Sequence, residues 1–118
     1  MNEETVCVHG LGYVGLPTAA MLANTGYDVS GFDVNPNRRA HLRDGEVPVD
    51  EPDLERFVRR ALTDGFDVVD EVQAADVHLV CVPTPYDADR DRMDLAYVEA
   101  AAEAIAEVLR SGNVVVLE

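Results

Sequence analysis

The feature that most constrains this chain is a glycine-rich stretch close to its N-terminus. An apolar run at residues 5–9 is followed by three glycines in the spacing G-x-G-x-x-G. Gly10 allows a sharp exit from a strand, Gly12 lets a pyrophosphate approach the backbone, and Gly15 lets a helix pack closely on the strand. The stretch therefore predicts a strand, a phosphate-binding turn and a helix whose first N–H groups face a diphosphate.

The sequence that follows favours a dinucleotide as the ligand. A helix of small residues is predicted at 14–25, Gly26 ends it, and an apolar strand at 28–32 leads directly to Asp33. An acid at this spacing accepts hydrogen bonds from the ribose hydroxyls of a bound dinucleotide. The alternative is a glycine-rich turn that binds nothing, and it leaves Asp33 without a role.

The rest of the chain alternates between helical and strand patterns. Asn35-Pro36 is typical of an N-cap followed by proline at the first helical position. The predicted elements are helices at 35–44, 52–65, 70–75 and 94–110, strands at 66–69, 77–82 and 114–117, and an acidic loop at 87–94. This alternation predicts an α/β fold, a Rossmann-type doubly wound parallel sheet of about five strands, order 3-2-1-4-5, in a single domain.

Pro83-Thr84-Pro85 follows the predicted strand at 77–82 and can neither continue it nor begin a helix at once. In open parallel sheets, ligands bind at the carboxyl ends of the strands. Thr84 is therefore a candidate contact to the cofactor. The alternative is that these residues only end the strand.

The charge of the chain limits its partners. Its 118 residues include 23 acidic and 9 basic ones, for a net charge of −14. Such a surface is a poor match for nucleic acid or an anionic membrane, and we expect neither as a partner. The acidity fits either an ordinary solvated surface or adaptation to high salt. With no long apolar run and no evident signal peptide, a cytoplasmic location is the simplest expectation.

Neither the cysteines nor the histidines suggest catalysis. Cys7 and Cys81 both fall inside predicted core strands, which favours buried, reduced thiols over a disulfide, a metal site or a nucleophile. His78 is interpreted as a core or strand-edge histidine, since the sequence places no partner acid beside it. We expect no metal site and no catalytic residue in this chain.

Five ordered motifs make the sequence similar to a known family. They lie at residues 10–20, 45–54, 81–85, 94–101 and 115–118. Together they closely resemble the N-terminal NAD-binding domain of the UDP-glucose/GDP-mannose dehydrogenase family, over essentially the whole chain. The forms at 16–20 and 51–54 are most similar to the UDP-N-acetyl-D-mannosamine dehydrogenases.

The resemblance implies an activity for a longer protein. The full enzyme would oxidise the C6 hydroxyl of a UDP-sugar to a carboxylate with two NAD⁺, with UDP-N-acetylmannosamine favoured and UDP-glucose next. The central helix, the C-terminal substrate domain and the catalytic Cys, Lys and Thr would lie beyond Glu118, in a homodimer. Residues 1–118 would then bind NAD without turnover. An NAD-sensing regulatory domain and an S-adenosylmethionine-dependent methyltransferase remain alternatives.

The resemblance also implies the residues that contact the cofactor. The phosphate loop is matched by Gly10, Gly12, Tyr13, Val14 and Gly15, the adenosine-ribose contacts by Asp33 and Arg38, and the Pro-Thr-Pro threonine by Thr84. The charge of Asp33 should favour NAD⁺ over NADP⁺, although Arg38 and Arg39 act the other way. His9 stands where the family usually has Val or Ile, and beside the pyrophosphate it would add pH dependence.

Overall fold

The computed structural model describes residues 4–47 and 52–118. Its elements are β1 (Thr5–His9), α1 (Gly15–Asn24), β2 (Asp28–Phe32), α2 (Pro36–Arg43), α3 (Pro52–Asp64), β3 (Phe66–Val68), β4 (Val77–Val80), β5 (Tyr86–Asp87), β6 (Arg92–Met93), α4 (Ala96–Val108) and β7 (Val114–Leu117). The predicted α/β class is confirmed. Residues 48–51, which precede the helix predicted at 52–65 and include part of the motif at 45–54, lie outside the described residues.

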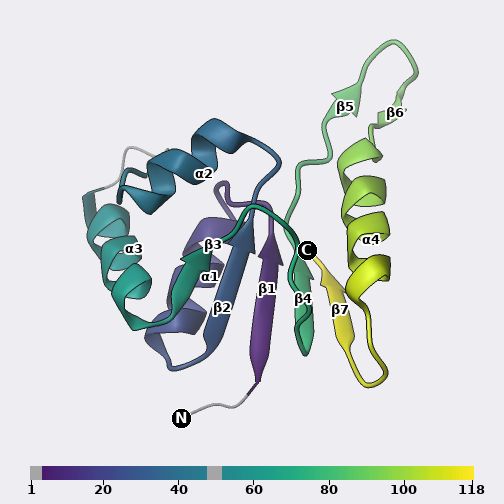
Figure 1. The fold of residues 1–118 in the computed structure, drawn as a ribbon. Helices are drawn as coiled ribbons and strands as arrows, with labels where there is room; N and C mark the ends of the chain where they lie inside the picture. Colours follow the sequence, from purple (N-terminus) through teal and green to yellow (C-terminus); the bar gives the residue numbers. More distant parts are fainter. Residues whose placement is uncertain (1–3, 48–51) are drawn as a thin grey trace.

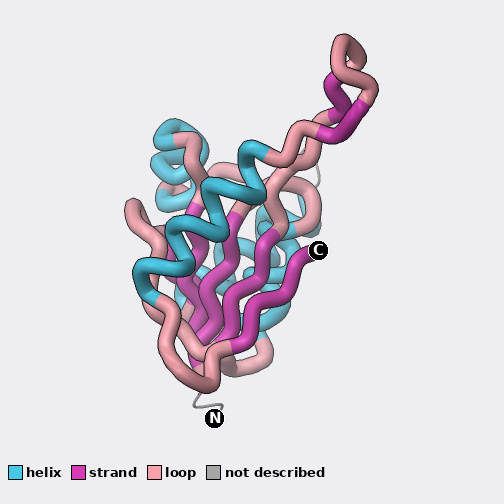
Figure 2. The backbone as a smooth tube through the Cα atoms, turned by 90° about the vertical axis from the view of Figure 1, so that its right-hand side faces the viewer, coloured by secondary structure: helices cyan, strands magenta, loops and turns pink. Residues whose placement is uncertain are grey.

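The central sheet has five parallel strands in the order β3-β2-β1-β4-β7, which confirms the predicted order (Figure 1). β1 lies in the middle, with Cys7 beside Ser30 of β2 on one side and beside His78 of β4 on the other. Figure 2 shows α4 on one face of the sheet and the other helices on the far side. This is the two-sided cover that parallel sheets require.

The main core fills the space between the sheet and the helices α1 and α3. Val6 and Val8 of β1 point into it, because alternate residues of a strand face opposite sides. On α1, Ala19, Ala20 and Ala23 are buried, and their small side chains let the helix lie close to the strands. This packing holds β1 and α1 against each other on the two sides of the turn that joins them.

The short helix predicted at residues 70–75 is wrong. This segment has no helical hydrogen bonding, and the chain runs irregularly from β3 to β4. Asp70 does not cap a helix, because its Oδ1 accepts hydrogen bonds from Arg39 Nε at 3.0 Å and Arg43 Nη2 at 2.9 Å. Both arginines come from α2, so a tertiary contact decides the local conformation.

The acidic loop predicted at 87–94 is instead a two-stranded hairpin, β5–β6, that projects beyond the sheet (Figure 1). The Asp87 carboxylate accepts hydrogen bonds from the N–H groups of Asp89 and Arg90 and so closes the turn. Asp91 takes the left-handed conformation, with φ of 51°. Within the described ranges, no helix has the length and apolar character needed to cross a membrane.

Candidate functional site

The turn between β1 and α1 depends on two glycines for its close packing. Gly10 has φ of +94°, and a Cβ there would lie 2.7 Å from the carbonyl oxygen of Cys81. A Cβ on Gly15 would lie 1.7 Å from the carbonyl oxygen of Gly10. Both glycines are therefore needed to bring the start of α1 against the ends of β1 and β4.

Gly12 has a different role from its two neighbours in the motif. A Cβ at Gly12 would meet only Arg38 Nη1, at 3.7 Å, so the backbone beside it borders open space. Apart from Arg38, no side chain of the described residues comes within 4 Å of this position, and a ligand can approach the peptide groups directly. The middle glycine thus leaves room for a bound group, whereas Gly10 and Gly15 shape the turn.

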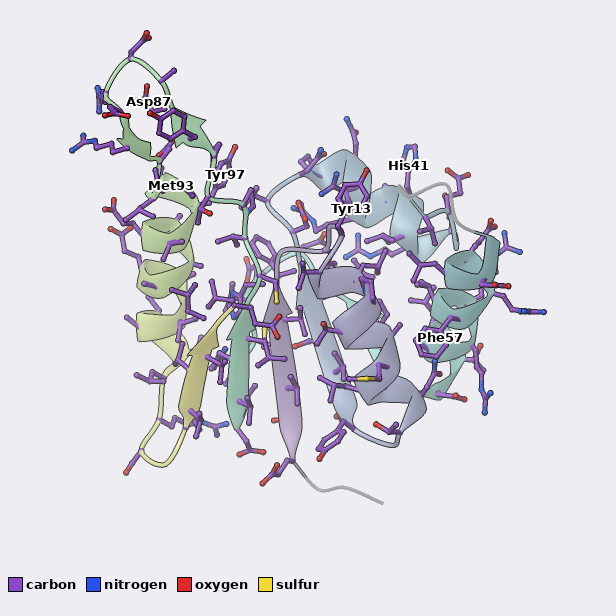
Figure 3. All side chains as sticks on the ribbon, turned by 180° about the vertical axis from the view of Figure 1, so that it is seen from behind. Tyr13, His41, Phe57, Asp87, Met93 and Tyr97 are labelled. Atoms are coloured by element: carbon purple, nitrogen blue, oxygen red, sulfur yellow. The ribbon has the colours of Figure 1, made fainter. Side chains whose placement is uncertain are left out.

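The start of α1 carries the features of an anion site. Val14 is the N-cap residue, it makes no side-chain cap, and the first turn of α1 contains no acid. Among the hydrogen bonds of the described residues, none uses the N–H of Gly12, Tyr13 or Val14. These donors and the positive end of the helix dipole can bind a phosphate without any basic side chain. Tyr13 is 80% exposed and lies above the carboxyl ends of the strands in Figure 3.

Asp33 joins the glycine turn to the beginning of α2. Its Oδ2 accepts a hydrogen bond from Leu11 N–H at 2.9 Å, and its Oδ1 accepts one from Asn35 N–H at 2.9 Å. Arg38 Nη1 lies 3.5 Å from the same Oδ2. A carboxylate offers about four acceptor positions, and hydrogen bonds use two of them while the Arg38 guanidinium stands beside a third. One ribose hydroxyl can bind directly, and a second requires Arg38 to move.

A cavity of about 230 Å³ lies beside Asp33, at the carboxyl ends of the strands. Phe32 at the end of β2 and Asp33 directly after it line the cavity, together with Val82 and Pro83 from the segment after β4 and Tyr97 from α4. Figure 3 shows Tyr97 near the beginning of α4, on the other side of this edge from Tyr13. The position and apolar walls suit a flat heterocycle whose ribose reaches Asp33.

Thr84 is not among the residues that line this cavity, although the neighbouring Val82 and Pro83 are. Ala100, Ala101 and Ala104 of α4 form another wall of the cavity, and this contribution is not among the sequence predictions. Their spacing places these small residues on one helix face, but it does not tell which way that face points. The structure thus brings together the turn, Asp33 and Arg38, and leaves Thr84 half-buried beside them.

His9 is at the inner end of the cavity and hydrogen-bonds another histidine. Its Nε2 lies 3.1 Å from His78 Nδ1, and both side chains are buried. Burial, followed by the charge of His78, lowers the pKa of His9 to about 4, and burial lowers the pKa of His78. His9 is therefore neutral at pH 7 and adds no positive charge beside a diphosphate. His78 is buried, as predicted.

Cys81 differs from its predicted position inside a core strand. It follows the last residue of β4, is only half-buried, and its thiol donates a hydrogen bond to Glu118 Oε2 at 3.1 Å. Burial, with the hydrogen bond and charge of Glu118, raises its pKa to about 12. Because the thiolate is the nucleophilic form, this thiol is unsuited to covalent catalysis. Neither Cys7 nor Cys81 forms a disulfide.

The turn, Asp33 and the cavity can each hold one part of a dinucleotide. Comparison with known proteins is consistent with this arrangement. Residues 4–118 match the sequence profile described as the UDP-glucose/GDP-mannose dehydrogenase family, NAD binding domain. A UDP-N-acetyl-D-mannosamine dehydrogenase from Methanococcus maripaludis is 44% identical over 119 residues, which cover 98% of this chain and 28% of that protein. An NDP-N-acetyl-D-galactosaminuronic acid dehydrogenase from Ralstonia nicotianae is 45% identical, with 100% and 28% covered.

Solved structures show the same relationship. A UDP-N-acetyl-mannosamine dehydrogenase from Staphylococcus aureus superposes with a TM-score of 0.91 at 35% identity, over 97% of this chain and 28% of that one. A UDP-glucose dehydrogenase from Pyrobaculum islandicum gives a TM-score of 0.87 at 35% identity, over 98% and 28%. The chain thus spans about 28% of the length of the curated relatives it matches.

Proposed function

Because this chain belongs to the UDP-glucose/GDP-mannose dehydrogenase family and corresponds to its NAD-binding domain, we propose that it forms the NAD site of a nucleotide-sugar 6-dehydrogenase. The full-length enzyme would oxidise the C6 hydroxyl of a UDP-sugar to a carboxylate with two NAD⁺. UDP-N-acetylmannosamine is the favoured substrate and UDP-glucose the next. The proteins similar to this chain include UDP-N-acetylmannosamine dehydrogenases and a UDP-glucose dehydrogenase. A cytoplasmic homodimer and adaptation to high salt belong to the same proposal.

The observation that carries the proposal is the free start of α1 beside Asp33. Among the described residues, the N–H groups of Gly12, Tyr13 and Val14 make no hydrogen bond and are available to a diphosphate, and Asp33 follows the last residue of the adjacent strand. A dinucleotide has its diphosphate and adenosine ribose at this relative position. When bound, NAD⁺ supplies the hydride acceptor for oxidation of the sugar.

Each element of the site has a separate task. The turn neutralises diphosphate charge through backbone donors and the helix dipole, which suits a chain with a net charge of −14. Asp33 selects the ribose, and its negative charge disfavours the 2′-phosphate of NADP⁺. Arg38 holds the Asp33 carboxylate at 3.5 Å and can swing over the ribose as a hydroxyl takes its place.

We also propose that residues 1–118 bind NAD⁺ without oxidising a nucleotide sugar. The second oxidation step needs a reactive thiolate to hold the aldehyde-level intermediate. Cys81 does not meet this need because its pKa is raised to about 12, and Cys7 belongs to the central strand β1 and is fully buried. The thiol and the sugar pocket would come from the remainder of a longer protein.

Isothermal titration calorimetry of the 118-residue chain with NAD⁺, NADP⁺ and S-adenosylmethionine tests the proposal. We expect NAD⁺ to bind most tightly and to produce no NADH when UDP-N-acetylmannosamine or UDP-glucose is added. Tighter binding of S-adenosylmethionine would instead indicate the methyltransferase alternative. NADH formation by this chain would contradict the assignment of the catalytic thiol to another segment.

A further inference from the structure

Three side chains with metal-ligating atoms meet on the α4 side of the sheet. Cys7 and His9 are two residues apart on β1 and so share a face, and His78 of β4 lies directly beside Cys7 in the parallel register. Their ligand atoms all lie within 4.8 Å of one another. The three residues are 0%, 1% and 0% exposed, respectively. We call them the Cys-His-His cluster.

The hydrogen bond within this cluster leaves buried polar atoms without partners. His9 Nε2 and His78 Nδ1 share one proton across 3.1 Å, while His9 Nδ1 and His78 Nε2 make no hydrogen bond within residues 4–47 and 52–118. Whichever ring donates, one outer nitrogen is an N–H without an acceptor and the other is a lone pair without a donor. The two inner nitrogens therefore face each other, and these are the atoms that can act as ligands together.

We propose that the Cys-His-His cluster is a binding site for a thiophilic divalent metal ion of the zinc class. Two imidazoles bound to a tetrahedral Zn²⁺ place their ligating nitrogens about 3.3 Å apart, given Zn–N bonds of about 2.0–2.1 Å. The observed 3.1 Å between His9 Nε2 and His78 Nδ1 is close to that separation. One thiolate and two imidazoles select Zn²⁺ and similar ions over Mg²⁺ or Ca²⁺, which prefer oxygen.

The surroundings of Cys7 can support a metal-bound thiolate. Burial raises the pKa of the Cys7 thiol, and hydrogen bonds from the Ser30 side chain and the Gln73 backbone partly offset this rise. Such donors to a ligating sulfur are typical of the shell around a metal site. On binding, the thiol proton leaves for solvent as the sulfur–metal bond forms, and the shared imidazole proton moves to an outer nitrogen. One proton is released per ion.

One member of the cluster borders a cavity. His9 lines the cavity of about 230 Å³, and we expect an ion to reach the buried cluster from this side, with a water molecule in its fourth position. The cluster borders the same cavity as Asp33, but its ligand atoms are different from the Asp33 carboxylate and from the unused N–H groups of the turn. The inference therefore does not depend on the proposed dehydrogenase function.

Titration of the 118-residue chain with Co²⁺, followed by displacement with Zn²⁺, tests the proposal. We expect one Co²⁺ per chain and a thiolate-to-cobalt charge-transfer absorption that Zn²⁺ removes. The absorption should disappear in Cys7→Ser and persist in Cys81→Ser, since Cys81 packs on the opposite side of the sheet. His78→Gln should weaken binding by at least about tenfold, the loss typical of an impaired metal site.

A second measurement does not require any variant to fold. In the ¹⁵N NMR spectrum of the wild-type chain, Zn²⁺ should shift the ring nitrogens of His9 and His78. Those of His41 should stay unchanged, because His41 is on α2 and pairs with Glu46. The proposal is overturned if no charge-transfer absorption forms, if it survives in Cys7→Ser, or if the rings of His9 and His78 do not respond.

Discussion

The two faces of the central sheet are built differently. The face toward α1 and α3, the apolar face, packs a continuous core in which Val6, Val8, Leu16 and Val29 are buried. The face toward α4, the polar face, has a small core of Val80, Ala101 and Ile105. It also carries the Cys-His-His cluster and borders the cavity. The larger hydrophobic core therefore lies on the apolar face, whereas the candidate metal ligands and the cavity lie on the polar face.

The edge strand β7 is also less completely buried than the strands that contribute to the apolar face. β7 packs beside β4, but its four side chains are between 40% and 62% exposed. An apolar edge strand of this kind offers unpaired backbone groups to another strand. The side chains of this edge strand are thus incompletely buried, and we predict that two copies of the chain can associate there.

The largest expected effect is on the apolar face. Leu16→Ala should lower the free energy of unfolding by about 4 kcal/mol, because Leu16 is fully buried and its removal leaves a cavity. Ile105→Ala, the matched change on the polar face, should cost only about 2 kcal/mol, since it belongs to the smaller core. Urea denaturation of both variants measures the difference. Equal losses would contradict the comparison between the faces.

Asp33→Ala should affect both binding and stability. NAD⁺ should bind about 1–3 kcal/mol more weakly, the loss expected for a charged hydrogen bond to ribose. Because the Leu11 and Asn35 N–H groups also lose their acceptor, unfolding in urea should become easier by a similar amount. Calorimetry and denaturation together separate the two roles. Weakened binding with unchanged stability would show that the turn does not depend on this carboxylate.

Acid should destabilise the polar face first. Folding lowers the pKa of His9 from 6.5 to about 4, so its stabilising contribution is present above pH 6.5 and is lost as pH falls toward 4. The expected slope is at most about 1.4 kcal/mol per pH unit in this window. Urea denaturation between pH 7 and pH 4, with a chelator present, measures it. His9→Gln should flatten the profile, and an unchanged slope would assign the acid sensitivity elsewhere.

The smallest expected effect comes from salt. With a net charge of −14, the folded chain repels itself, and added ions screen that repulsion. The melting temperature should rise between dilute buffer and molar KCl. Sucrose at matched osmolarity is the control for effects other than screening. A melting temperature that does not rise would remove the support for adaptation to high salt.

Much of the fold was predictable because its signals are local. The glycine spacing, the strand before it and Asp33 after the next strand predict β1, α1 and β2 without reference to the rest of the chain. Asn35 is the N-cap of α2, as predicted, and its Oδ1 accepts hydrogen bonds from the N–H groups of Asn37 and Arg38. Alternating strands and helices then predict the sheet order.

The parts that could not be predicted depend on contacts between distant segments. The false helix at 70–75 fails because Arg39 and Arg43 engage Asp70. The wall of the cavity depends on how α4 is rotated against the sheet, which its sequence alone does not fix. The meeting of His9 and His78 arises from the register between β1 and β4, across 69 positions of sequence.

Binding of NAD⁺ to Gly12→Val, measured by isothermal titration calorimetry, tests the central claim most directly. In the wild type, a Cβ at position 12 would contact only Arg38. The valine side chain should therefore fill the open space beside the turn without disturbing the core residues. We expect NAD⁺ affinity to fall by about 100-fold or more, corresponding to about 2.7 kcal/mol, with the circular dichroism spectrum unchanged. Met21→Ala, on an exposed part of α1, is the control and should bind as the wild type does. Wild-type affinity in a folded Gly12→Val chain would contradict the account.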